Sequence, residues 1–185
     1  MGLIIKKIES LDSNLLNQIA KMHKIEMKST VATIISIDDL VRIYNILLRH
    51  EKIEIFYLEN GKSVIGAVIL ENKNRIRLGS YFLLSILIFK YFFSYPLKFL
   101  NLIFTRNIYK YFYFDKKILA IFISSSYQGY NYGTLLIDFL FNSKNYKNII
   151  LDTDKDNHNA RSFYLKNRFK EIKKYNNKII FLRIS

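Results

Sequence analysis

The sequence contains no cysteine, and its three histidines lie far apart along the chain. Without cysteine there is no disulfide framework, no thiolate nucleophile and no zinc site built on thiolates. Three scattered histidines do not form a cluster of metal ligands, so we expect no bound metal ion. The chemistry of the protein must therefore come from hydroxyl groups, carboxylates, amides and the backbone.

A secretory signal is also missing from the start of the sequence. The segment from Met1 to Ser10 contains Lys6 and Lys7 but few apolar residues. It therefore does not show the charged-then-apolar order of a signal peptide. We expect a cytoplasmic protein.

The composition is that of a folded chain with a large core. Half of the 185 residues are hydrophobic and 16% are aromatic, which excludes a disordered chain. A chain of this length buries roughly 70% of its unfolded surface as one domain and is too short for two ordinary domains. We therefore predict a single domain over residues 1–185.

Acidic residues are few: 15 stand against 29 lysines and arginines, for a net charge of +14. Such a charge attracts phosphates, anionic lipid head groups and nucleic acid without specificity. We expect no specific nucleic-acid partner. Half of the net charge comes from residues 75–117, where Asp115 is the single acidic residue among Arg75, Arg77, Lys90, Lys98, Arg106, Lys110, Lys116 and Lys117.

Hydrophobic periodicity and turn residues predict a mixed α/β domain, that is, α+β with a mixed sheet. A strand at Leu3–Ile8 precedes two helices, one capped by Asp12 or Ser13 and one from about Ile37 to His50 capped by Ser36 or Asp38. The runs 53–58 and 64–70 flank Asn60-Gly61 and predict a hairpin. We then expect a strand at 118–123, a helix at 133–141, a strand at 148–152, a helix at 159–167 and a hairpin around Asn176-Asn177.

A long apolar segment lies between the third and fourth predicted strands. From Tyr81 to Phe104 large apolar residues recur every three or four positions, and only Lys90 and Lys98 are charged. This spacing predicts an amphipathic helical insertion at about 78–114, kinked or split near Pro96. The two lysines and the proline argue against a membrane span. The apolar stripe is therefore expected to pack on the domain, in a homodimer, or in a peripheral contact with an anionic membrane.

The stretch from Ile118 to Leu136 combines an apolar strand, a loop of small residues and the start of a helix. Free N–H groups and the positive end of the helix dipole at such a junction favour a pyrophosphate. Glycines let the backbone approach the phosphate oxygens. A turn without a ligand has the same pattern, so the loop alone leaves both interpretations open. A Rossmann dinucleotide site is excluded, because the glycine spacing differs and no acidic residue follows a second strand at the expected distance.

The loop resembles the acyl-CoA motif of the GNAT superfamily of N-acetyltransferases, which reads Gln/Arg-x-x-Gly-x-Gly/Ala after a strand. Gln128, Gly129 and Gly133 match the usual form, and Asn131 replaces the central glycine. Asparagine is the next most tolerant residue in the left-handed conformation, so we expect the loop to keep its shape.

A second block agrees with the first. It is similar to the Asn-x-x-Ala-x-x-Phe-Tyr-x-x-x-Gly-Phe segment of the same superfamily. Asn157, Ala160, Phe163, Tyr164 and Phe169 fit in register, while Arg168 replaces the glycine that closes the helix. The resemblance covers nearly the whole chain except residues 75–117, and it implies the GNAT-type acyl-CoA N-acyltransferase fold.

The resemblance implies a role for each matching residue, with acetyl-CoA as co-substrate. The backbone of a β-strand would pair with the pantetheine arm, the loop amides would wrap the pyrophosphate, and Tyr164 would donate a proton to the departing CoA thiolate. Alternatively, Tyr164 is a core aromatic beside Phe163. The cofactor-binding residues implied are Ile121, Phe122, Ile123, Gln128, Gly129, Tyr130, Asn131, Tyr132, Gly133, Thr134 and Asn157.

Attack by an amine requires its neutral form, so a proton acceptor is expected. Asp152 lies at a strand end where some members of the superfamily carry a carboxylate that accepts this proton through water. Asp154 is two residues on and so points to the same face of an extended chain. Such a pair can attract a cationic amine and accept its proton. Alternatively, this is a solvated acidic loop before a helix capped by Asp156 or Asn157.

These residues together imply an enzyme that transfers an acetyl group from acetyl-CoA to the primary amine of a small molecule. We favour a nucleotide- or lipid-linked amino sugar as the acceptor, because a basic, apolar insertion suits a phosphorylated or membrane-borne molecule. Protein N-terminal or lysine acetylation is the alternative within the class. A non-catalytic CoA-binding or membrane-docking module is the alternative from another class.

Overall fold

The computed structural model describes residues 2–9, 12–27, 31–61, 63–72 and 109–185. A seven-stranded sheet in the order β1-β2-β3-β4-β5-β7-β6 forms its centre. All neighbouring strands are antiparallel except β4 and β5, which are parallel. The strands are β1 (Leu3–Lys7), β2 (Ile53–Asn60), β3 (Ser63–Asn72), β4 (Lys116–Ile123), β5 (Asn148–Asp154), β6 (Lys170–Tyr175) and β7 (Lys178–Ile184).

In the described part of the chain four α-helices cover the sheet: α1 (Ser13–Glu26), α2 (Ile37–Arg49), α5 (Tyr132–Asn142) and α6 (His158–Lys166). Asp12 caps α1 by accepting hydrogen bonds from the N–H groups of Asn14 and Leu15, at 2.9 and 3.2 Å. Ser36 caps α2 in the same way through the N–H of Asp39, at 3.1 Å. These polar side chains begin the helices because they satisfy N–H groups that have no intrahelical acceptor.

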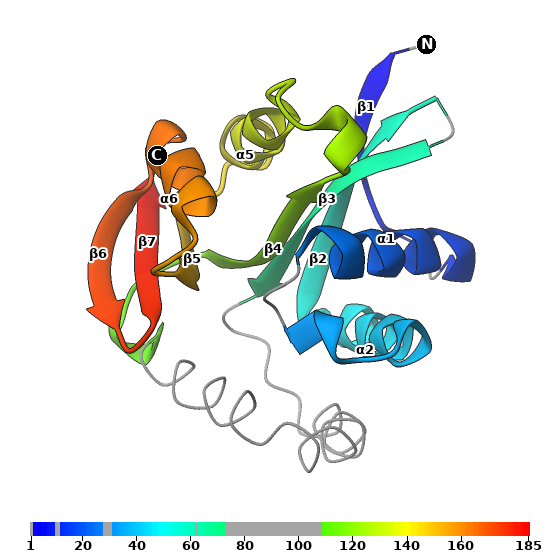
Figure 1. The fold of residues 1–185 in the computed structure, drawn as a ribbon, viewed down its shortest axis with the longest axis horizontal. Helices are drawn as coiled ribbons and strands as arrows, with labels where there is room; N and C mark the ends of the chain where they lie inside the picture. The colour runs from blue at the N-terminus through cyan, green and yellow to red at the C-terminus, as the bar shows by residue number, and fades with distance from the viewer. Residues whose placement is uncertain (1, 10–11, 28–30, 62, 73–108) are drawn as a thin grey trace.

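The core lies in layers on the two faces of the sheet (Figure 1). On one face α1 and α2 pack against apolar residues of β2, β3 and β4, including Ile55, Ile69 and Phe122. On the other face α5 and α6 pack against a cluster that includes Phe56 and Phe181. Strands buried on both faces, such as β3, carry apolar residues at nearly every position, in agreement with their central place.

The predicted order of elements is confirmed, and most boundaries agree within two residues. The hairpin between β2 and β3 has its positive φ at Gly61, 67°. β5 extends two residues beyond its predicted end, so Asp154 is part of the strand. The predicted helical insertion falls in the chain between β3 and β4, and its apolar stripe from Phe82 to Phe104 is outside the described residues.

Short 3-10 helices complete the described chain: η1 (Val31–Thr33), η2 (Tyr109–Tyr111) and η3 (Ser125–Tyr127). The segment that returns to β4 packs Tyr109 and Phe114 against Ile150 and Ile180, which makes a third apolar cluster over β5 and β7. None of the helices in the part of the chain that the structure describes has the length and apolar character needed to span a bilayer.

Candidate active site

Strands β4 and β5 separate shortly after they begin. Among the described residues their parallel pairing is confined to Lys116 with Ile149 and Lys117 with Ile150. Beyond this point β4 pairs with β3 on one side, and none of the described strands pairs with its other edge. Figure 1 shows β4 and β5 diverging, and we call this divergence the fork. The free edge includes Ile121 and Ile123, so it offers backbone donors and acceptors to an extended ligand.

A β-bulge lies on β4 at the base of the fork. Ile69 of β3 pairs with Ala120, whereas the next residue, Leu70, pairs with Ile118. Leu119 is therefore the extra residue, and it is exposed. The bulge also changes the face of the strand: Ile118 packs in the α5 and α6 cluster, but Ala120 packs in the α1 and α2 cluster. Bulges bend the strand that carries them, which contributes to the divergence. Sequence periodicity did not reveal it.

The loop between β4 and α5, residues 124–131, follows the free edge directly. In the part of the chain that the structure describes, no hydrogen bond engages the backbone N–H groups of Gly129, Tyr130 and Asn131. The next three N–H groups, from Tyr132 to Thr134, belong to the first turn of α5, where no intrahelical acceptor exists. Six consecutive donors at the positive end of a helix thus have no acceptor among the described residues and can bind an anionic ligand.

Asn131, in the place of the central glycine, has the left-handed conformation that the sequence predicts, with φ 61° and ψ 16°. It is the N-cap residue of α5, but its side chain makes no capping hydrogen bond. Gly129 also has a positive φ, 87°. Two left-handed residues close together turn the chain sharply from β4 into α5.

The two glycines of this motif have different roles. A Cβ at Gly133 would come within 3.0 Å of two ring atoms of Phe163 on α6. Gly133 therefore allows close packing of α5 against α6. The expectation that a glycine makes room for phosphate oxygens then applies to Gly129 and not to Gly133. At Gly129 an added Cβ would meet nothing within 4 Å, so the space beside that residue is open.

Gln128 uses its side chain to tie the loop to two other elements. Its amide Nε2 donates to the carbonyl of Ile123 at 3.0 Å and to the carboxylate of Glu26 at 3.2 Å. Glu26, the last residue of α1, also accepts a hydrogen bond from the N–H of Ser125 at 2.9 Å. The carboxylate thereby caps η3, whose own N-cap residue Ser124 makes no side-chain hydrogen bond. Sequence reasoning missed Glu26, because no local motif connects it to this loop.

We expect Glu26→Ala to raise the KM for acetyl-CoA by about 5- to 50-fold, because two hydrogen bonds that position the loop are lost. The turnover number and the acceptor KM should change much less. The KM of Glu26→Gln for acetyl-CoA should lie between those of the parent and Glu26→Ala. Its amide oxygen can still accept a hydrogen bond from the N–H of Ser125, but its NH₂ group faces the NH₂ group of Gln128. Steady-state kinetics of the three proteins would test this. A lower KM in Glu26→Ala would show that the carboxylate acts mainly by repelling phosphates.

Tyr164 lies on α6 and is buried against aromatic neighbours. Its ring is 5.3 Å from Phe163, 5.8 Å from Phe169 and 5.7 Å from Phe181, measured between centroids. Burial, and secondarily the charge of Asp152, raise the pKa of the Tyr164 hydroxyl above its usual value. The hydroxyl is therefore protonated at neutral pH, as a proton donor must be.

Asp152 lies on β5 just beyond the closed end of the fork. Its carboxylate accepts a hydrogen bond from the hydroxyl of Tyr109, and it pairs with Lys117 of β4 at 3.3 Å and Lys178 of β7 at 3.5 Å. Lys178 also pairs with Asp154 at 2.9 Å, which confirms that the two carboxylates share one face of the strand. Lys117 lies over the ring of Tyr109, 3.6 Å from its centroid. Sequence reasoning missed these three partners of Asp152.

These partners control the charge of the Asp152 carboxyl. Burial would raise its pKa, but Lys117, Lys178 and the hydrogen bond from Tyr109 outweigh burial and hold the pKa below its usual range. Asp152 is consequently ionised at neutral pH. It is a weaker base than an isolated carboxylate, but it can attract an ammonium group.

Two further residues of the second motif have structural tasks. Asn157 is the N-cap of α6, where its side-chain oxygen accepts a hydrogen bond from the N–H of Ala160 at 3.0 Å. Arg168 has φ 63°, so the position that is glycine in the motif does require a left-handed residue after the helix. Arginine adopts this conformation at some cost in strain.

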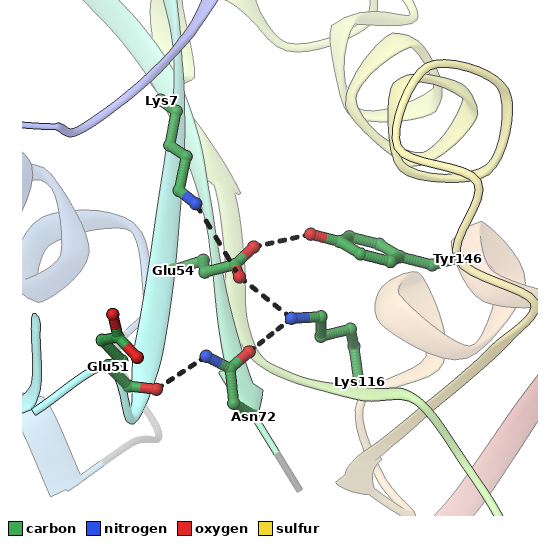
Figure 2. Close-up of polar contacts among 6 residues, drawn as sticks. All are labelled: Lys7, Glu51, Glu54, Asn72, Lys116 and Tyr146. Atoms are coloured by element: carbon green, nitrogen blue, oxygen red, sulfur yellow. Dashed lines mark hydrogen bonds and ion pairs between the residues drawn. The ribbon is translucent and has the colours of Figure 1, made fainter. Parts of the chain in front are cut away.

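A polar network surrounds Lys116 at the start of β4, where β4 and β5 are still paired (Figure 2). The loop that follows β4 is at the other end of this strand. The Glu54 carboxylate of β2 accepts hydrogen bonds from the Lys116 ammonium group at 3.0 Å and from the Tyr146 hydroxyl at 2.6 Å. The ammonium group of Lys7 forms an ion pair with the same carboxylate at 3.8 Å. Lys116 also donates to Asn72, which donates to the carbonyl of Glu51. A cavity of about 690 Å³ adjoins this network, and no predicted site residue lines it. The network therefore joins β1 to β4 rather than belonging to the reacting centre.

The geometry defines a site for a ligand with an anionic group at a helix N-terminus and an extended arm along a strand edge, the arrangement of an acyl-CoA site. The chain matches the model of the Acetyltransferase (GNAT) family over residues 19–169, which is more than half of its length. The protein belongs to this family. It is an acyltransferase, and acetyl-CoA is its co-substrate.

Solved structures share the fold along the whole chain. PaiA N-acetyltransferase from Thermoplasma acidophilum in complex with coenzyme A is 16% identical, with a TM-score of 0.61 and complete coverage of both chains. A chimera of spermidine N-acetyltransferase SpeG from Vibrio cholerae with hSSAT is 17% identical, with a TM-score of 0.63 and coverage of 100% and 96%. The N-acetyltransferase PseH from Campylobacter jejuni is 12% identical, with a TM-score of 0.57 and coverage of 98% and 97%. No curated protein sequence matches the chain.

Proposed function

We propose that the protein acetylates the primary amine of a small phosphorylated acceptor, with a nucleotide- or lipid-linked amino sugar as the favoured class. The observation that supports acetyl transfer most strongly is the fork followed by six free N–H donors. An unpaired strand edge that leads directly into such a loop suits the pantetheine arm and pyrophosphate of one ligand. The proposed cofactor-binding residues are Ile121 to Ile123, Gln128 to Thr134, and Asn157.

Backbone and side-chain groups of this chain have separate roles in the proposed acetyl transfer. A backbone N–H of the free β4 edge hydrogen-bonds the thioester carbonyl and stabilises negative charge on its oxygen as the C–N bond forms. Asp152 accepts, through water, the proton that the amine loses. Tyr164 donates a proton to the sulfur as the C–S bond breaks and its electron pair remains on the sulfur. The tyrosine is later reprotonated from water.

The charges around Asp152 support a phosphorylated acceptor. The carboxylates of Asp152 and Asp154 can attract the ammonium group, while Lys117 and Lys178 lie beside them and can bind a phosphate. An acceptor that carries both groups complements this arrangement. One of the similar solved structures is a chimera of a spermidine N-acetyltransferase, so polyamine acetylation must be compared directly.

A panel of amines tests the proposal by release of the CoA thiol from acetyl-CoA. We expect the highest kcat/KM for a nucleotide-linked amino sugar, a lower value for the free amino sugar, and the lowest for spermidine and for a peptide N-terminus or lysine. Lys117→Met should lower kcat/KM for the phosphorylated acceptor about 10-fold more than for the free sugar, because only the phosphorylated acceptor loses a charge-assisted contact, whereas the loss of the ion pair with Asp152 affects both. A preference for spermidine or peptide would reject this acceptor class. Thermal stabilisation by CoA without thiol release from any amine would indicate a binding module.

A cytoplasmic location, with the protein either free or peripheral to the membrane, is part of this proposal. The predicted stripe from Phe82 to Phe104 supports self-association as a homodimer or binding to anionic lipid. Binding to anionic lipid would bring a membrane-borne acceptor close to the basic residues 75–117.

A further inference from the structure

Three tyrosines gather around the loop that follows β4. The rings of Tyr130 and Tyr132 stack, with centroids 5.9 Å apart and planes 21° apart. The ring of Tyr127 is tilted by 40° against that of Tyr132, with centroids 6.5 Å apart. Tyr130 is the most exposed of the three, with 67% of its surface accessible, whereas Tyr127 and Tyr132 are half-buried. A stacked, exposed ring has one face covered and its other face open to a ligand.

The loop has no positive side chain with which to bind an anion. From Ser124 to Thr134 the sequence contains no lysine and no arginine, although the chain as a whole carries 29 of them. Backbone N–H groups can position phosphates, but they supply less attraction than a bidentate arginine. The loop instead places aromatic rings among its free N–H donors. Any additional affinity in this loop must therefore come from uncharged contacts.

A purine ring is the ligand that an exposed aromatic ring next to a phosphate site binds best. Bases stack on aromatic side chains without needing a specific hydrogen-bond pattern, since every base has a π-face. In a nucleotide only the ribose separates the base from the phosphates. Tyr130 is itself one of the residues with a free N–H, so a base attached to phosphates bound there lies within reach of its ring.

We infer that the exposed face of Tyr130 stacks on the adenine ring of acetyl-CoA, and that Tyr132 and Tyr127 position Tyr130 for this contact. The inference rests on the proposed binding of acetyl-CoA at the loop. It assigns to Tyr130 the recognition of the nucleotide half of the co-substrate, separate from the transfer of the acetyl group.

The test compares acetyl-CoA with S-acetyl-4′-phosphopantetheine, which has the thioester and one phosphate but no adenosine. Tyr130→Ala should raise the KM for acetyl-CoA by about 5- to 100-fold, the range expected when one base-stacking contact is lost. Its kcat should stay within about 2-fold of the parent. With S-acetyl-4′-phosphopantetheine the parent and Tyr130→Ala should have the same KM. Tyr130→Phe should resemble the parent with both substrates, because it keeps the ring.

Tyr111→Ala is the matched control, since Tyr111 is also exposed but lies on η2. It should leave both KM values unchanged. Equal losses with both thioesters in Tyr130→Ala would overturn the adenine contact while leaving the proposed acetyl transfer intact. No turnover of either thioester by the parent would instead remove the proposed function.

Calorimetry with 3′,5′-ADP then tests the base contact without catalysis. Weaker binding to Tyr130→Ala than to the parent and to Tyr111→Ala would support the stacking. Equal affinity for all three proteins, or no binding to the parent, would refute it.

Discussion

Tyr164→Phe should lower kcat by about 10- to 1000-fold, the scale of a lost general acid, while KM for acetyl-CoA changes little. The phenyl ring can keep the same contacts with Phe163, Phe169 and Phe181, so the fold should be unaffected. Only the hydroxyl group is removed, and with it the proton that the thiolate needs as it leaves. Steady-state kinetics with the best acceptor of the amine panel would measure the loss.

Tyr175→Phe is a suitable control because it removes a tyrosine hydroxyl from the outer strand β6. It should leave kcat unchanged. If Tyr164→Phe turns over at the parental rate and unfolds at the same temperature, Tyr164 is a packing residue, which is the alternative that its buried position also allows. A loss of activity accompanied by a large loss of stability would point to the same conclusion.

Acidification from pH 7.5 to pH 4 should remove about 3 kcal/mol of folding stability through His23 alone. His23 lies on α1, is buried, and stacks on Phe122 of β4 at 5.2 Å between ring centroids. Burial lowers the pKa of its imidazole from 6.5 to about 4. Its Nδ1 is hydrogen-bonded to the Tyr44 hydroxyl, and its Nε2 is buried without a partner among the described residues.

The direction of this effect follows from the order of the two pKa values. Between pH 6.5 and 4 the unfolded chain binds a proton at His23 and the folded chain does not, so stability falls as the pH falls through this window. Asp152 also has a lowered pKa in the folded protein, but a carboxyl group of that kind contributes stability that is lost below about pH 4. The two effects therefore occur in different pH ranges.

His23→Gln provides the measurement, since an amide can hydrogen-bond Tyr44 but does not titrate. Urea unfolding at pH 7.5, 5.5 and 4 should show a flatter pH dependence for this variant than for the parent. His158→Gln, a change at an exposed histidine, is the control and should follow the parent. Parallel curves for all three proteins would mean that His23 becomes protonated within the folded state without cost.

Much of the fold could be predicted from short stretches of sequence. The caps at Asp12 and Ser36, the hairpin at Gly61 and the left-handed residue at Asn131 all depend on residues within three or four positions of one another. The two motifs were recognised for the same reason, because each lies in one continuous segment. Their matching residues Gln128, Tyr164 and Asn157 were found, but the contacts of their side chains were not.

Local sequence thus specified the elements, the β4–α5 loop and the residue types of an acetyl-transfer site. The three-dimensional arrangement alone established the fork, the bulge at Leu119, the packing of Gly133 on Phe163 and the ion pairs that keep Asp152 charged. It also brought Glu26 to Ser125 and Gln128, which lie 99 and 102 residues away in the chain. Periodicity and turn propensity report on neighbours a few residues apart, whereas these contacts arise when the helices and strands pack. Long-range contacts of this kind leave no pattern in a single sequence.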